Sequence, residues 1–266
     1  MNKKNRILFD IETARIDEFD NLNETQKEYL LRGVKNEEEK EQSKKLINLY
    51  PYTAMVVCIA VINVDERNAG IFYYSNKQDK WIIENKNDSI SIEGIEESLV
   101  DNWLKNLCIQ KKLIKAEFYP FSNEENILEK FWQVIECYDQ FITFNGRNFD
   151  CPFLHIRSAI KKIVPSVNLI TPRFKGPEYH CDLLEELTYN GATRKFNLDF
   201  YCNSLGIESP KSHGISGYDM NKLFYDEKRY EDIAKYCLGD VVATTELFHF
   251  WDSYLNPQNF KSRKGS

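Results

Sequence analysis

The stretch Ile7–Thr13, ILFDIET, decides the fold class of this chain. Residues 6–11 have the apolar run and the short length of a buried strand. Inside the stretch, Asp10 and Glu12 stand two positions apart, so both carboxylates point to the same side of a strand. Two carboxylates on one face are costly to bury unless a positive charge holds them together. The pattern therefore predicts a site for Mg²⁺ or Mn²⁺, which prefer oxygen ligands.

An isolated Asp-x-Glu pattern also has a simpler explanation, in which both carboxylates are solvated at the end of a strand. That pattern is common in proteins of every kind. The acidic residues that lie further along the chain decide between the two interpretations.

The composition is that of an ordinary soluble globular protein. Of the 266 residues, 42% are hydrophobic, which is enough for one sizeable α/β core. No apolar run approaches the length of a membrane span, and residues 1–4 lead into the first strand without a signal-peptide cleavage site. Seven scattered cysteines never form a C-x-x-C pair. This favours reduced thiols in a cytoplasmic protein over a zinc cluster.

The net charge of −6 does not by itself predict a nucleic-acid-binding protein, because affinity for phosphates comes mainly from Lys and Arg. Residues 141–215 are different, since they hold nine Lys or Arg and seven Asp or Glu, a balance of +2 that leaves −8 for the remainder. An acidic protein with such a stretch can bind a polyanion locally, with strong sensitivity to salt.

The first half of the chain predicts strands separated by polar segments. Residues 17–50 are charged and helix-prone, and we interpret them as a solvated helical insertion. Residues 55–64 predict a strand and 69–75 its hairpin partner, so that three neighbouring strands form with residues 6–11. Residues 76–121 carry no motif. They contain a polar loop at 84–91 and a possible helix around 93–107, and we interpret the whole as an insertion or rim element.

The middle of the chain predicts a helix, a strand and a second helix. Residues 123–138 have apolar side chains at helical spacing, with Asn123 as a possible N-cap. Residues 140–144 read as a short strand, and Pro152 is well placed in the first turn of a helix that runs towards Lys162. Asp150 then lies near a strand end, where ligand sites of α/β folds gather.

The last third contains one further helical motif. Residues 164–177, with Arg173 and Lys175, predict a loop. Residues 180–184 predict an edge strand that enters a helix with Asp182 as its N-cap, although a supporting role in catalysis is an alternative for this residue. A helix over 196–205 is expected to stop at Gly206, and 209–218 predict a loop.

Residues 228–254 predict a long helix that carries Tyr236 and Asp240. The two residues are four positions apart, so they share one helix face. Taken alone, the pair is better explained by a core tyrosine and an aspartate at the rim.

Taken together, Asp10, Glu12, Asp150, Tyr236 and Asp240 form an ordered set of motifs. Their order resembles the DEDD, or DnaQ-like, superfamily of 3′–5′ exonucleases, which share the ribonuclease H-like fold. The motif that runs from residue 145 to 154 is most similar to the proofreading exonuclease domain of family B DNA polymerases.

The motif from Tyr236 to Asp240 resembles the tyrosine branch of this superfamily, because Lys235 stands where the histidine branch has its histidine. No polymerase motif accompanies these residues. The chain is therefore similar to the stand-alone bacterial predicted exonucleases related to the family B exonuclease domain.

Phosphodiester hydrolysis needs an activated water, stabilisation of added negative charge and help for the departing 3′-oxygen, and two metal ions about 3.5–4 Å apart supply all three. We expect two Mg²⁺ or Mn²⁺ ions here. Asp10 is predicted to bind both ions, Glu12 and Asp240 to complete the first site, and Asp150 to hold the second, partly through water. Tyr236 has an ordinary pKa of about 10, so we expect its hydroxyl to position the attacking water, the role that the resemblance also implies.

Six residues are candidates for contacts with the substrate. Asn145 is expected to hydrogen-bond the terminal nucleotide, and Phe149 to stack on a base, although core packing explains Phe149 equally well. The resemblance implies that the backbone at Thr13 meets the 3′-hydroxyl. Lys211, or Arg173 together with Lys175, are candidates for phosphate contacts, and ordinary surface charge is the alternative explanation for each.

We therefore expect one α/β domain over residues 1–256 with a ribonuclease H-like fold. Its central mixed sheet has an antiparallel hairpin after the first strand, then parallel strands, and helices flank the sheet. Insertions are expected at about 17–50 and 76–121, and residues 257–266 form a short polar tail.

The expected function is a metal-dependent 3′–5′ exonuclease that acts on the 3′ end of single-stranded DNA, releases nucleoside 5′-monophosphates and needs no membrane. An RNA exonuclease is one alternative, since the 2′-hydroxyl decides between the substrates and no residue of this sequence identifies a group that reads it. A catalytically silent nucleic-acid-binding module is a second alternative. A third is a soluble α/β domain in which the carboxylates never meet.

Overall fold

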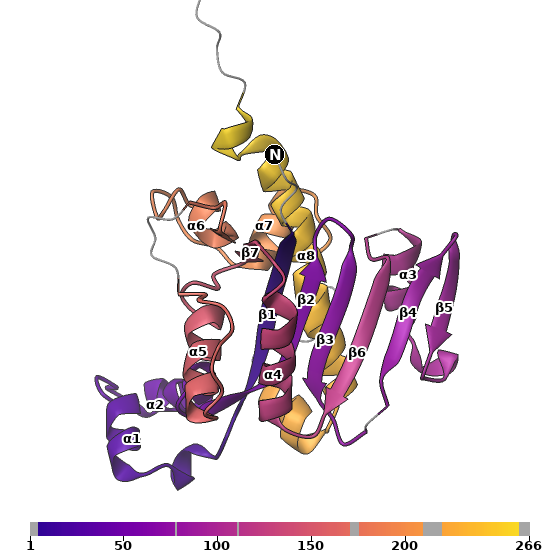
Figure 1. Ribbon diagram of the computed structural model, residues 1–266. Coiled ribbons are helices and arrows are strands. Elements are labelled where there is room, and N and C mark those ends of the chain that lie inside the picture. The colour runs from indigo at the N-terminus through magenta and orange to yellow at the C-terminus, as the bar shows by residue number, and fades with distance from the viewer. Residues whose placement is uncertain (1–4, 78, 111, 171–175, 210–219, 261–266) are drawn as a thin grey trace, which may run out of the picture.

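The computed structural model describes residues 5–77, 79–110, 112–170, 176–209 and 220–260 (Figure 1). It is organised around an eight-stranded sheet in the order β5-β4-β6-β3-β2-β1-β7-β8. The strands are β1 Arg6–Arg15, β2 Ala54–Asn63, β3 Asn68–Tyr74, β4 Trp81–Lys86, β5 Ser89–Glu93, β6 Lys115–Phe121, β7 Gln140–Thr143 and β8 His180–Asp182.

The sheet is mixed. β1, β2 and β3 are antiparallel neighbours, so the three adjacent strands predicted from the first quarter of the chain are confirmed. β7 runs parallel to β1 and β8 runs parallel to β7. This arrangement confirms the predicted α/β class with a hairpin followed by parallel strands, as in a ribonuclease H-like fold.

The helices cover both faces of the sheet. They are α1 Glu24–Leu30, α2 Glu37–Lys45, α3 Asn102–Ile109, α4 Glu124–Ile135, α5 Asp150–Ile160, α6 Leu183–Leu187, α7 Leu198–Ser204 and α8 Tyr230–Tyr254. Short helical turns lie at Phe19–Asn21, Leu46–Leu49, Glu97–Leu99, Lys222–Asp226 and Pro257–Asn259. In Figure 1, α4 and α5 lie on one side of the sheet and α8 crosses the other.

β1 contributes to both cores because its side chains alternate between the faces. Ile7, Phe9 and Ile11 pack into the core beneath α4 and α5. Leu8 and Ala14 pack into the core beneath α8. The even-numbered residues of β1 therefore face α8.

Residues 76–121 contribute three strands to the sheet. The interpretation of 84–91 as a polar loop is wrong, because β4 and β5 form an antiparallel hairpin there. Its turn places Asn87 and Asp88 at φ 53° and 65°. β6 was not predicted, and it lies between β3 and β4. Most side chains of β5 are half-buried or exposed, so the hairpin lacks the clean apolar alternation by which strands are recognised.

The predicted helix ends agree with the structure. Asn123 caps α4 by accepting a hydrogen bond from the Asn126 N–H at 2.9 Å. Gly206 follows α7 with φ 71°, the left-handed conformation expected of a residue after a helix. Residues 17–50 hold α1 and α2, as their helix-prone sequence predicts. Among the described residues, no helix has both the length and the apolar character needed to cross a membrane.

Candidate active site

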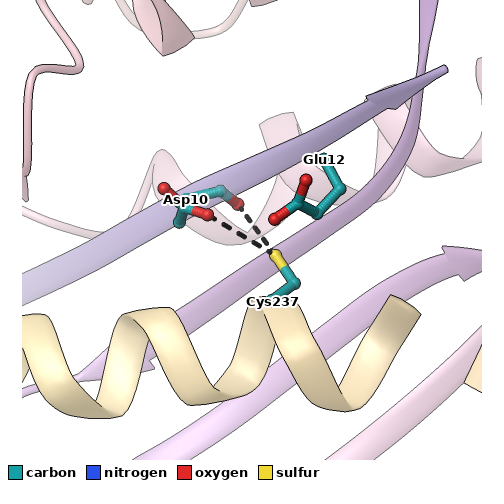
Figure 2. A group of neighbouring side chains, drawn as sticks. All are labelled: Asp10, Glu12 and Cys237. Atoms are coloured by element: carbon teal, nitrogen blue, oxygen red, sulfur yellow. Dashed lines mark hydrogen bonds between the residues drawn. The ribbon is translucent and has the colours of Figure 1, made fainter. Parts of the chain in front are cut away.

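Asp10 and Glu12 project from the middle of β1 towards α8 (Figure 2). Both side chains are half-buried, on the strand face that also carries Leu8 and Ala14. The ligand atoms of Asp10, Glu12 and Cys237 of α8 all lie within 4.8 Å of one another. The two carboxylates of the ILFDIET stretch are therefore close neighbours.

Thr13 follows directly after an irregularity in the pairing of β1 with β2. Its buried hydroxyl donates a hydrogen bond to the carbonyl of Asn48 at 2.7 Å. This bond holds residues 46–49 against the strand. The backbone contact between Thr13 and a 3′-hydroxyl stays a prediction.

Asp150 is the first residue of α5, and it is buried. Its Oδ1 accepts a hydrogen bond from the Ile11 N–H at 3.1 Å, so the carboxylate lies beside the segment between Asp10 and Glu12. β7 pairs with β1 as far as Ile142. Beyond that point, Asp150 occupies the edge of β1 that β7 no longer covers.

The turn between β7 and α5 has little conformational freedom. Asn145 has φ 64°, a left-handed conformation that asparagine tolerates better than most residues. A Cβ on Gly146 would lie 2.4 Å from the Cβ of Thr143, so the close approach requires glycine. The Cys151 N–H donates to the Gly146 carbonyl at 2.8 Å. These contacts set where Asp150 begins its helix.

Asp182, the last residue of β8, binds the backbone of this turn. It caps α6 as predicted, accepting from the Leu184 N–H at 3.1 Å. Its carboxylate also accepts from the Asn145 and Arg147 N–H groups, each at 2.9 Å. The Arg147 guanidinium adds a bond to Glu185 at 2.9 Å. The sequence predicted only the cap, because the turn lies 37 residues before Asp182 and local spacing carries no sign of that contact.

Helix α8 brings Tyr236 and Asp240 to the same place. Asp240 interacts electrostatically with both Asp10 and Glu12. Tyr236 interacts with Asp240, Glu12 and Asp10. Asp150 interacts with Asp10, Glu12 and Asp240. The structure therefore brings together all four carboxylates and the tyrosine, from β1, α5 and α8.

The clustered carboxyl groups resist ionisation. Burial, reinforced by the charges of Asp150 and Asp240, raises the pKa of Asp10 well above its usual range. Burial and the same two charges raise the pKa of Glu12 likewise. Burial also raises the pKa of Asp150 to about 7, although the Ile11 N–H works in the opposite direction. Ionising these carboxyl groups together would bring like charges close, and a bound cation would relieve that repulsion.

The donor atoms fit a hard divalent ion. Carboxylate oxygens of Asp10, Glu12, Asp150 and Asp240 are the ligands that Mg²⁺ and Mn²⁺ prefer. Cys237, which the sequence reading did not foresee, has its Sγ 3.9 Å from Asp10 Oδ2. Burial raises the pKa of this thiol, and the thiolate is the form that binds metals. The carboxylates are therefore the better ligand set.

The substrate candidates are spread over the rim and outside the described residues. Asn145 is half-buried, and its Oδ1 accepts a hydrogen bond from Asn148 at 3.1 Å. Phe149 packs against the core beneath α5, with its ring centroid 5.5 Å from that of Phe153, which favours the core-packing explanation. The remaining candidates fall on residues that the structure does not describe, namely Arg173, Lys175 and Lys211.

Two protein families match this chain. Residues 111–254, which include α5 and α8, match the family of predicted 3′–5′ exonucleases related to the exonuclease domain of PolB. Residues 4–179, which include β1 and α5, match the exonuclease domain of family B DNA polymerases. No curated protein gives a significant match. Each family match spans more than half of the sequence. The chain thus belongs to the predicted 3′–5′ exonucleases related to the exonuclease domain of family B DNA polymerases.

Proposed function

We propose that this exonuclease uses two divalent metal ions to hydrolyse single-stranded DNA from its 3′ end, releasing nucleoside 5′-monophosphates. The observation that carries the proposal is the meeting of four carboxylates from three separate elements around β1. Their mutual repulsion and all-oxygen chemistry fit Mg²⁺ or Mn²⁺. Membership of the exonuclease family identifies the phosphodiester as the bond to be cleaved.

Each carboxylate has its own role in the proposed binding of the two metal ions. Asp10, which interacts with Asp150, Asp240 and Glu12, would contribute to both ion sites, with Glu12 and Asp240 completing the first. Asp150 would serve the second, and its bond from the Ile11 N–H keeps one carboxylate oxygen in a fixed orientation. When bound, the two ions activate the attacking water and neutralise the charge that develops on the phosphate and the departing 3′-oxygen.

Tyr236 supports the reaction as a hydrogen-bond donor. Burial, with the neighbouring charges of Asp240, Glu12 and Asp10, raises its pKa above the ordinary value of 10. The hydroxyl therefore keeps its proton at neutral pH and is unsuited to remove one from water. Its role is to orient the attacking water towards the phosphorus atom, so that attack is in line with the leaving oxygen.

The test is degradation of a 5′-labelled single-stranded DNA oligonucleotide by purified protein with Mg²⁺, with Mn²⁺ and with EDTA. We expect a ladder of products shortened from the 3′ end, which EDTA abolishes. Asp10→Ala and Asp240→Ala should each lose at least 10³-fold in rate while remaining folded, because each change removes a predicted metal ligand. Asp232→Ala is the matched control, since this aspartate lies on α8 and pairs with Arg229 at 2.6 Å.

The comparison between variants decides the site assignment. Wild-type rates in both Asp10→Ala and Asp240→Ala would show that the activity resides elsewhere. A matched RNA oligonucleotide, assayed in parallel, decides the substrate class. Faster degradation of RNA than of DNA would overturn the DNA preference and leave the metal site intact.

A further inference from the structure

Three side chains form a stack at the start of helix α7. The rings of Phe196 and Phe200 are stacked, with centroids 3.9 Å apart and an interplanar angle of 14°. The guanidinium carbon of Arg194 lies 5.3 Å from the centroid of the Phe196 ring. Phe196 is therefore in contact with a cation and a ring, whereas Phe200 has 46% of its surface exposed.

Helix α7 lies beside the candidate active site. α7 packs against α8, the helix that carries Tyr236 and Asp240. Cys202, buried in α7, lies within electrostatic range of Asp240. The ring of Tyr201 contacts that of Phe144 at 6.0 Å, and Phe144 immediately precedes the turn that leads to Asp150. Figure 1 shows α7 adjacent to α8 and close to β7.

Phe200 keeps a ring that is open to solvent within the stack. Among the described residues, Phe200 has one parallel ring neighbour, Phe196, while Tyr201 meets it edge-on at 88°.

The charge around the stack favours a polyanion. Arg194 and Lys195 are both exposed and directly precede Phe196, within a chain whose overall charge is −6. Exposed aromatic rings flanked by cations are the usual platform for single-stranded nucleic acid, because bases stack on the rings and phosphates meet the cations.

We propose that Phe200 is a stacking platform for a nucleobase of the single strand upstream of the cleaved 3′ nucleotide, with Arg194 and Lys195 contacting its phosphates. The assignment rests on the proposed function, since it places the substrate strand across α7. It adds a subsite that holds the strand by stacking, independently of base sequence.

Binding tests the platform without any need for turnover. In EDTA, we measure the fluorescence anisotropy of a labelled 12-nucleotide oligothymidylate with the full chain. Phe200→Ala should raise Kd about tenfold, as loss of one base–aromatic stack does. Phe200→Trp should keep or lower Kd. Tyr254→Ala is the control, because this exposed tyrosine at the far end of α8 lies outside the stack.

Hydrolysis gives the second readout. Phe200→Ala should raise KM for the oligonucleotide about tenfold and leave hydrolysis of thymidine 5′-monophosphate p-nitrophenyl ester unchanged, since this substrate has one nucleotide and cannot reach the platform. Unchanged Kd in Phe200→Ala, or no binding by the wild type, overturns the platform. Binding that Phe200→Ala weakens, without hydrolysis by the wild type, supports the platform and overturns the proposed exonuclease function.

Discussion

Tyr236 illustrates how burial and neighbouring charges select a role for a single side chain. Its reference pKa already lies above neutrality, and its surroundings raise the pKa further. Asp240, Glu12 and Asp10 all disfavour a phenolate at this position. At the pH of an ordinary assay the hydroxyl therefore keeps its proton and is able to donate a hydrogen bond.

Replacing Tyr236 by Phe removes the hydroxyl and keeps the ring. We expect kcat to fall about 10²-fold because the attacking water loses its orientation, while KM for the oligonucleotide stays unchanged. The measurement is a pair of kcat and KM values for the wild type and Tyr236→Phe between pH 6 and 10. A wild-type rate in the variant, or a loss that appears only above pH 9, would contradict the orienting role.

Asp150 links the site to the pH dependence of stability. Its pKa is about 7 in the folded chain, against an ordinary value of 3.8. The folded state therefore binds this proton more tightly than the unfolded state does. The protonated carboxyl contributes its stability at low pH, and the contribution is lost as pH rises from about 4 through about 7.

In EDTA, we expect ionisation of Asp150 to lower the Tm of the wild type as the pH is raised from 5 to 7.5, while His180, whose pKa burial lowers to about 3, acts in the opposite direction. Asp150→Asn should raise the metal-free Tm at pH 7.5, by an amount equivalent to about 1–2 kcal/mol, and remove the contribution of Asp150 to the pH dependence. The asparagine oxygen can still accept the Ile11 N–H bond. Calorimetry in EDTA measures both effects, and the idea fails if Asp150→Asn lowers Tm at pH 7.5.

At the scale of elements, the turn between β7 and α5 determines where Asp150 stands. Asp182 holds that turn from a different strand, through backbone bonds to Asn145 and Arg147. It also caps α6. One buried carboxylate thus joins two elements that lie far apart along the chain.

Asp182→Ala should destabilise the fold by about 3 kcal/mol, since it removes a helix cap and leaves buried amides without an acceptor. We also expect kcat to fall, because the turn that positions Asp150 at the start of α5 loses its two hydrogen bonds to Asp182. Asn123→Ala is the matched control, as Asn123 caps α4 through the Asn126 N–H at 2.9 Å. Urea unfolding and oligonucleotide assays of both variants give the comparison. Equal destabilisation in the two variants would mean that the turn bonds contribute nothing beyond the cap.

At the scale of the whole molecule, the pair Asp10 and Glu12 and a deeply buried ion pair occupy opposite faces of the sheet. Glu124 of α4 accepts hydrogen bonds from Arg157 of α5 at 2.6 Å and 2.9 Å, and from the Val56 N–H of β2 at 2.8 Å. Both charged side chains are at most 4% exposed. This pair joins α4, α5 and β2 on the face of the sheet opposite α8.

Glu124→Gln keeps the shape and removes the charge that compensates Arg157. We expect a loss of about 3–5 kcal/mol in unfolding free energy, with kcat at 20 °C unchanged because the carboxylate cluster faces α8. Chemical unfolding and the oligonucleotide assay measure the two quantities separately. A stable variant with lost activity would show that the two faces are coupled.

The sequence alone determined the features that depend on local spacing. The period of two in ILFDIET placed Asp10 and Glu12 on one face, and the period of 3.6 in residues 228–254 placed Tyr236 and Asp240 on another. The sequence also predicted helix ends, at Asn123 and Gly206, because a cap depends on residues within one turn. The resemblance to the exonuclease family can be recognised in the sequence, because the three motifs around Asp10, Asp150 and Asp240 are short and occur in the family's order.

Only the tertiary structure decided which distant groups meet. Asp150 reaches the Ile11 N–H across 139 positions, and Asp182 reaches Asn145 across 37. No local pattern encodes such contacts, since they follow from strand order and from the close packing that glycine allows at residue 146. The hairpin of β4 and β5 has a related explanation, because β4 joins the sheet by pairing with β6 and β5 has no buried side chain that would show a strand pattern.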